Sequence, residues 1–305
     1  MKRKVIQMAG KTMVVSLPAE WVKKYGVKKG DEIELSESGQ RMIISTTKQY
    51  ETSEKAQIDA SNLNERALEW TLSALHKSGY DEIVINYKKP ETIKIIEKYL
   101  KTFLMGFIIM SHADNKCVLK SITKNVESEF DSTLRRAFLV TISLGEETLK
   151  CIKEKKFSEL LELVHYEQTN NQLTNFCERL INKGAYKNHK HTCFMYVINW
   201  NLEKICDNYK YICKYLEKTP VKLNEVVLKF FEETNAYFKA YYSLFYNFDL
   251  QKLTELSEKK KILINKAMEM NKTKNYKEIV VIHHLMNIIA QTSDFSSSMV
   301  ALNQE

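Results

Sequence analysis

The placement of glycine and proline constrains this chain more than any other feature. Of its eight glycines and three prolines, only Gly184 and Pro220 lie beyond Gly145. Because these two residue types most often end helices, so long a stretch almost without them predicts long helices with few joints. The joint at Pro220 divides the region into two three-helix units, which we expect to pack antiparallel in one bundle. The predicted helices span residues 125–153, 157–183, 190–217, 222–247, 250–272 and 276–302.

The first 46 residues predict β-structure instead. A short helix over 19–25 begins after Pro18 and ends at Gly26, a residue suited to the end of a helix. A domain of this size buries too little surface to be stable alone, so we expect it to dimerise. Apolar and β-branched residues between turn signals predict strands over 4–8, 12–17, 32–35 and 41–45.

The middle of the chain predicts a linker and a small mixed module. Residues 46–62 are polar and lack a period, which indicates a linker. The module that follows has the order helix, strand, helix, strand, strand, with a turn at Asp114-Asn115 between the last two strands. The fold class is therefore predicted to be α+β. Its expected parts are a β domain over 1–46, a linker and mixed module over 47–124, and a helical domain over 125–305.

Most of the net charge of +8 is concentrated at the N-terminus. Within residues 1–30 the single acid, Glu20, is accompanied by eight basic residues. A dense basic cluster attracts polyanions through counterion release, and nucleic acid is the usual polyanion. The basic residues are Lys2, Arg3, Lys4, Lys11, Lys23, Lys24, Lys28 and Lys29.

Three segments of this region resemble SpoVT/AbrB-type domains. They are residues 4–7, the run Gly10 to Trp21 with its Ser-Leu-Pro, and the Gly-Val-Lys-Lys-Gly-Asp run that begins at Gly26. The resemblance covers residues 3–46 and implies a dimer of exchanged β-hairpins that binds double-stranded DNA through basic residues of one face. Members of the family also serve as antitoxins and as dimerisation modules. The residues that we expect to contact DNA are Lys2, Arg3, Lys4, Lys11 and Arg41.

The helical half resembles PhoU-domain proteins, specifically the archaeal type that carries an AbrB-like domain in front. The resemblance rests on residues 130–138 and 200–207 and spans 125–303. It implies an E-x-x-x-D metal motif, which Glu203 and Asp207 match. Two carboxylates at this spacing lie on one helix face and can reach the same cation.

Glu167 and Asn171 repeat that spacing with an amide in the second place, whereas Met286 and Ala290 stand where a second cluster would need ligands. A divalent or ferric ion at Glu167, Asn171, Glu203 and Asp207 is one interpretation. The other is that these are ordinary polar positions that help to pack the bundle.

No motif indicates catalysis: phosphate-binding loops, a G-x-S-x-G nucleophile and an H-E-x-x-H zinc site are all lacking from the sequence. The six cysteines form no C-x-x-C pair, which favours a reducing compartment. Residues 99–110 are the most apolar window and are shorter than the ~20 residues of a membrane span. We therefore expect a cytoplasmic protein that is not an enzyme and does not insert into membranes.

Together these features predict a homodimeric, DNA-binding transcriptional regulator of phosphate uptake or phosphate homeostasis. The alternative is a PhoU-type adaptor that does not bind DNA. In that case the N-terminal domain only dimerises, and the helices dock on a phosphate transporter or a sensor histidine kinase.

Overall fold

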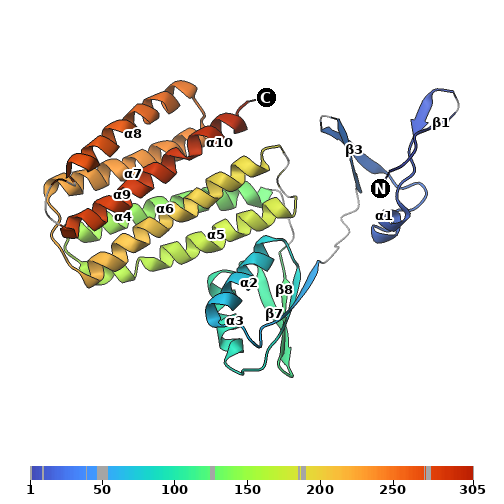
Figure 1. Ribbon diagram of the computed structural model, residues 1–305, viewed down its shortest axis with the longest axis horizontal. Coiled ribbons are helices and arrows are strands. Elements are labelled where there is room, and N and C mark those ends of the chain that lie inside the picture. Colours follow the sequence, from blue (N-terminus) through green and yellow to red (C-terminus); the bar gives the residue numbers. More distant parts are fainter. Residues whose placement is uncertain are drawn as a thin grey trace. The chain divides into compact units, whose positions relative to one another are not determined.

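The computed structural model describes residues 2–8, 10–38, 40–46, 54–123, 128–184, 186, 190–270, 272 and 276–304. The chain divides into two compact units, Met1–Glu54 and Lys55–Glu305 (Figure 1). Short β-hairpins make up the first unit and helices dominate the second, so the predicted α+β class is confirmed. Among the described residues, no helix has the length and apolar character needed to cross a bilayer.

The first unit contains two separate hairpins. Strands β1 (Ile6–Met8) and β2 (Thr12–Val14) pair antiparallel, as do β3 (Ile33–Ser38) and β4 (Arg41–Thr46). Helix α1 (Ala19–Lys24) lies between them in the sequence. None of the side chains described between residues 2 and 46 is buried. A unit whose described side chains are nowhere buried needs another surface to cover its apolar side chains.

The second unit begins with a four-stranded sheet of order β5-β6-β8-β7. Helices α2 and α3 lie side by side on one face of this sheet (Figure 1). Leu72 and Ile96 from the helices pack with Ile83 and Leu119 from the strands in one core. The elements are β5 (Lys55–Asp59), α2 (Glu65–Lys77), β6 (Glu82–Asn86), α3 (Thr92–Thr102), β7 (Phe107–Ala113) and β8 (Lys116–Ser121).

The order of the mixed module agrees with the sequence, apart from its first strand. Asp114 and Asn115 both have positive φ, 52° and 59°, as a two-residue hairpin between β7 and β8 requires. Residues 55–59, which we expected to be linker, form β5 and pair in parallel with β6. The alternation of Ala56 and Ile58 with polar neighbours matches a strand that has one face on a core. The rest of the expected linker, residues 47–53, lies outside the described residues.

Helices fill the remainder of the chain close to their predicted ranges. The helix expected over 157–183 is divided into a 3-10 segment and α5, and the last expected helix is broken at Asp294. The elements are α4 (Ser128–Lys153), the 3-10 segment η1 (Phe157–Leu161), α5 (Val164–Asn182), α6 (Thr192–Lys218), α7 (Glu225–Tyr246), α8 (Leu250–Met270), α9 (Tyr276–Ser293) and α10 (Phe295–Leu302).

The helices contact one another in two groups of three. Helices α4, α5 and α6 pack on each other, as do α7, α8 and α9, and the pairs α6–α9 and α4–α7 join the groups. One continuous apolar core runs through both groups. Side chains of α6 and α7 approach the backbone of α4 closely at Gly145. A Cβ added there would lie 2.8 Å from the ring of Tyr209 and 3.0 Å from Asn235 Oδ1.

A buried arginine joins the mixed module to the helices. Arg179 of α5 is fully buried and donates hydrogen bonds to the carbonyl oxygens of His76 and Tyr80, at 3.1 and 2.7 Å. It also forms an ion pair of 2.6 Å with Asp81. Lys183, the residue directly after α5, pairs with the same carboxylate at 2.7 Å. These contacts fix the sheet to α5 within the second unit.

Candidate functional site

The five residues predicted to contact DNA are all exposed. Lys2, Arg3 and Lys4 lie on the segment that leads into β1, and Lys11 lies in the turn after it. They therefore occupy the two ends of one hairpin, separated by the length of β1, about 10 Å at 3.3 Å per residue. Arg41 begins β4 on the other hairpin, opposite Ser38. The first four residues thus share a hairpin that Arg41 does not belong to.

The remaining basic residues of the N-terminal cluster are exposed as well. Lys23 and Lys24 form the last turn of α1, and the ammonium of Lys24 lies 5.3 Å from the centre of the Tyr25 ring. Lys28 and Lys29 lie between α1 and β3. Because these four lysines are exposed, a polyanion can reach them.

Large apolar side chains are also exposed throughout this unit. The exposed fractions run from 49% for Val15 to 66% for Met13. Single exposed apolar residues are ordinary on protein surfaces, but so many in a unit whose described side chains are nowhere buried are typical of an interaction surface. The residues are Val5, Ile6, Met8, Met13, Val15, Leu35 and Met42.

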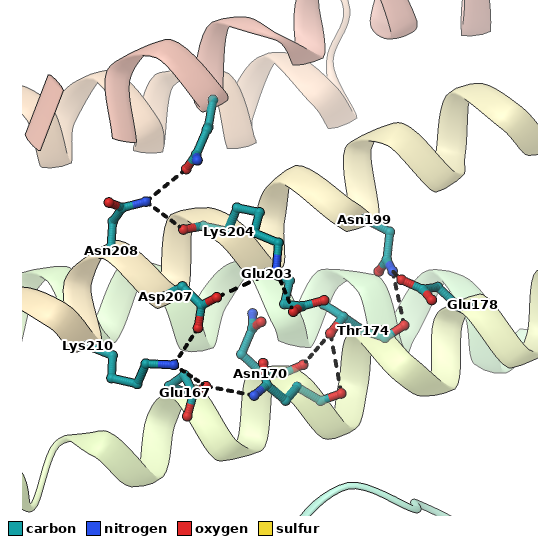
Figure 2. A network of polar contacts seen from close by, with 12 residues as sticks. Glu167, Asn170, Thr174, Glu178, Asn199, Glu203, Lys204, Asp207, Asn208 and Lys210 are labelled. Carbon is teal, nitrogen blue, oxygen red and sulfur yellow. Dashed lines mark hydrogen bonds and ion pairs between the residues drawn. The ribbon is translucent and has the colours of Figure 1, made fainter. Parts of the chain in front are cut away.

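The four predicted metal ligands come together between α5 and α6, in a chain of polar contacts shown in Figure 2. Asn171 Nδ2 donates to Glu167 Oε1 at 2.7 Å, and Lys210 Nζ donates to the same oxygen at 2.7 Å. Lys210 also pairs with Asp207 at 2.5 Å, and Lys204 joins Asp207 to Glu203. We call these six residues the polar seam: Glu167, Asn171, Glu203, Lys204, Asp207 and Lys210.

Lys210 and Lys204 are the members that the sequence pattern did not predict. Burial by itself lowers the pKa of Lys210, but hydrogen bonds and charges from Asp207 and Glu167 outweigh it and raise the pKa above its usual value. The pKa of Lys204 is raised in the same way, against burial, by Glu203 and Asp207. Both side chains are therefore held as ammonium ions. The only sequence signal for an ion pair was their spacing from the acids: Lys210 is three residues after Asp207, and Lys204 directly follows Glu203.

The donor set of the polar seam does not fit a bound metal ion as it stands. Ammonium groups from two lysines already pair with all three carboxylates. Within the part of the chain that the structure describes, no three His, Cys, Asp or Glu side chains are grouped to hold a metal.

The contacts of α6 with α9 continue the polar seam with neutral groups. Asn208 Nδ2 donates to Gln291 Oε1 at 3.1 Å, and Asn208 Oδ1 lies 2.9 Å from His284 Nδ1. Burial lowers the pKa of His284, and the charge of neighbouring His283 adds to that effect. Along α9, His284 and Gln291 flank Met286 and Ala290, the two positions where a second metal cluster would need ligands.

Comparison with known proteins supports the interpretation of the N-terminal unit. Residues 6–52 match the family model described as "Antidote-toxin recognition MazE, bacterial antitoxin". An AbrB/MazE-like domain therefore forms the N-terminus, and such a domain fits a regulator of the DNA-binding or antitoxin type. No curated protein and no solved structure matches this chain.

Proposed function

We propose that this chain is a homodimeric, DNA-binding transcriptional regulator of phosphate uptake that catalyses no reaction. The observation that carries DNA binding is the exposed basic cluster of an AbrB/MazE-like domain. Counterion release from DNA by Lys2, Arg3, Lys4 and Lys11 supplies affinity with little sequence preference. Arg41 adds a fifth positive charge from the second hairpin.

Dimerisation is supported by the absence of buried side chains among the described residues of the same unit. Two copies that exchange hairpins cover each other's apolar side chains and present two basic clusters to one duplex. Because the two clusters bind the same duplex together, the dimer binds DNA more tightly than one cluster would alone. The exposed apolar residues of β1, β2, β3 and β4 support this arrangement.

The link to phosphate is supported by the likeness of residues 130–138 and 200–207 to PhoU-domain proteins and by the two groups of three helices. In this proposal the helical domain receives the phosphate signal, and its conformation alters how tightly the dimer holds DNA. A cytoplasmic location accompanies that role, because the DNA lies there.

DNA binding is tested by replacing Lys2, Arg3 and Lys4 with alanine and measuring fluorescence anisotropy on a labelled promoter duplex. We expect the variant to bind DNA more weakly. The plot of log K against log salt should also become less steep, by about 0.9 for every phosphate that a removed side chain neutralised. Alanine at Lys252, Lys259 and Lys261, three lysines of α8, removes the same charge elsewhere and is the matched control. Equal losses in both triple variants would show that the N-terminal cluster has no special role.

The phosphate link is tested separately, by comparing transcripts of a deletion strain and its parent in high and low phosphate. Altered expression of phosphate-uptake genes only in the deletion strain supports the proposal. Expression that responds to phosphate equally in both strains contradicts it, whatever the DNA affinity.

The second candidate is an adaptor that docks on a phosphate transporter component or a histidine kinase. Three exposed aromatic residues on one face of α6 favour it: Tyr196, Trp200 and Tyr211 are 39%, 43% and 44% exposed. Aromatic side chains are enriched at protein interfaces. Recovery of such a partner by a variant with Lys2, Arg3, Lys4 and Lys11 neutralised would favour the adaptor over the regulator.

A further inference from the structure

The polar seam places one ammonium group between carboxylates of two neighbouring helices. Lys210 Nζ lies 2.7 Å from Glu167 Oε1 and 2.5 Å from Asp207 Oδ1. The side chains of Lys210, Glu167 and Asp207 are only 13%, 8% and 15% exposed. Because Glu167 belongs to α5 and the other two belong to α6, this ammonium ties the two helices together, as Figure 2 shows.

Two further oxygen atoms of the polar seam are of the kind that a hard cation would use. Asn171 Oδ1 and Glu203 Oε2 are buried and accept no hydrogen bond from the residues that the structure describes. Carboxylate and amide oxygens are the preferred ligands of such cations. The seam therefore contains oxygen atoms of the right chemistry for a cation, and the cation shared by Glu167 and Asp207 is the ammonium of Lys210.

We propose that Glu167 and Asp207 form a cation site that the chain fills with its own Lys210 ammonium, in place of the metal ion that the residue pattern implies. A tethered ammonium does not dissociate, so the contact between α5 and α6 is independent of metal supply. A divalent ion would have to displace Lys210 Nζ from both carboxylates and then lie beside its charge, so the native chain takes up none.

Replacing Lys210 with methionine tests this proposal. Methionine fills the apolar part of the space but removes the cation that Glu167 and Asp207 share, which leaves Glu167 with only the Asn171 amide and Asp207 with only Lys204 at 3.6 Å. In EDTA we expect the Tm of Lys210→Met to lie about 5 °C or more below that of the native chain. Excess Mn²⁺ should restore most of that loss, while the Tm of the native chain stays the same in EDTA and in Mn²⁺.

Calorimetric titration supplies a second readout, with one Mn²⁺ bound per chain by Lys210→Met and none by the native protein. Lys261→Met is the matched control, because Lys261 pairs with Glu258 three residues before it on the exposed side of α8. That variant should show no dependence on Mn²⁺. The triple variant Glu167→Gln/Asp207→Asn/Lys210→Met should lose the Mn²⁺ effect, which assigns the effect to these two carboxylates.

Two results would overturn the proposal. One is a native chain that binds Mn²⁺ with one-to-one stoichiometry or loses stability in EDTA. The other is a folded Lys210→Met whose Tm does not respond to Mn²⁺. If Lys210→Met does not fold in EDTA, it is refolded in excess Mn²⁺, which should take the place of the ammonium; failure to fold there as well would also overturn the proposal.

Discussion

Arg179 shows how much of this structure depends on single buried charges. Burial lowers its pKa, which Asp81 partly offsets, and the guanidinium satisfies two backbone carbonyl oxygens that have left water. A planar guanidinium reaches all three acceptors at once, which the single ammonium of a lysine cannot reproduce. The attachment of the sheet to α5 therefore depends on this one side chain more than on the surface ion pairs nearby.

Replacing Arg179 with methionine should lower the free energy of unfolding by about 3–5 kcal/mol, since it leaves buried acceptors unpaired. Arg179→Lys should recover only part of the loss. Urea denaturation followed by circular dichroism measures both variants. Arg136→Met, at an exposed arginine of α4, is the control and should change stability by less than about 0.5 kcal/mol. Equal effects at the two positions would contradict the proposed attachment.

His76 introduces a pH dependence at the same junction. Burial lowers its pKa from 6.5 to about 4, against the hydrogen bond with the Met105 carbonyl oxygen, which raises it. Between these two values the unfolded chain binds a proton that the folded chain excludes. The stability that His76 contributes is therefore complete above pH 6.5 and falls as the pH drops towards 4, by about 3 kcal/mol in total.

His76→Phe should flatten the stability profile between these pH values by about that amount. Urea denaturation at several pH values measures it, and His165→Phe, at an exposed histidine of α5, is the control. A native profile that stays flat from pH 7 to pH 4.5 would show that His76 titrates normally.

At the scale of the elements, three helices meet at one glycine. Tyr209 of α6 donates a hydrogen bond of 2.7 Å to Asn235 of α7, whose Nδ2 donates to the Gly145 carbonyl oxygen at 2.9 Å. The Cβ of any other residue would enter the space that the Tyr209 ring occupies. This glycine therefore serves helix packing and does not interrupt α4.

Gly145→Ala should destabilise the protein by about 1–3 kcal/mol, although alanine is the better helix former by about 1 kcal/mol. Adding Tyr209→Leu provides room for the new methyl group. In a double-mutant cycle the two changes should thus cost less together than the sum of their separate costs. Strict additivity, or a stabilised Gly145→Ala, would contradict the close packing of α4, α6 and α7.

The elements also show what the sequence could predict. The helices of the second half follow from local signals, namely a helical apolar period and the near absence of glycine and proline. Strand β5 was missed because it pairs with β6, whose partner residues lie 27 positions further along the chain. The spacing of Glu203 and Asp207 correctly placed both on one face of α6. The role of Lys210 was not predictable, because only the packing of α5 on α6 buries a lysine that would otherwise be solvated.

At the scale of the whole molecule, the two units differ in what stabilises them. Residues 55–305 contain two apolar cores, whereas no side chain described in the first unit is buried. We therefore expect the second unit to fold without another chain and self-association to reside in the first.

Light scattering after size-exclusion chromatography tests this division. The full chain should have the mass of a dimer, and a fragment of residues 55–305 should be a folded monomer. A dimeric fragment would place self-association in the second unit. A full chain that is monomeric at micromolar concentration would show that the protein does not dimerise.

Binding of the full chain to a promoter duplex, measured by fluorescence anisotropy across a salt series, decides whether this protein is a DNA-binding regulator. A DNA-binding regulator should bind tightly at low salt and lose affinity steeply as salt rises. It should also keep its preference for the promoter in excess competitor DNA. No binding at low salt would contradict DNA binding by this protein and leave the N-terminal unit as a dimerisation module of an adaptor.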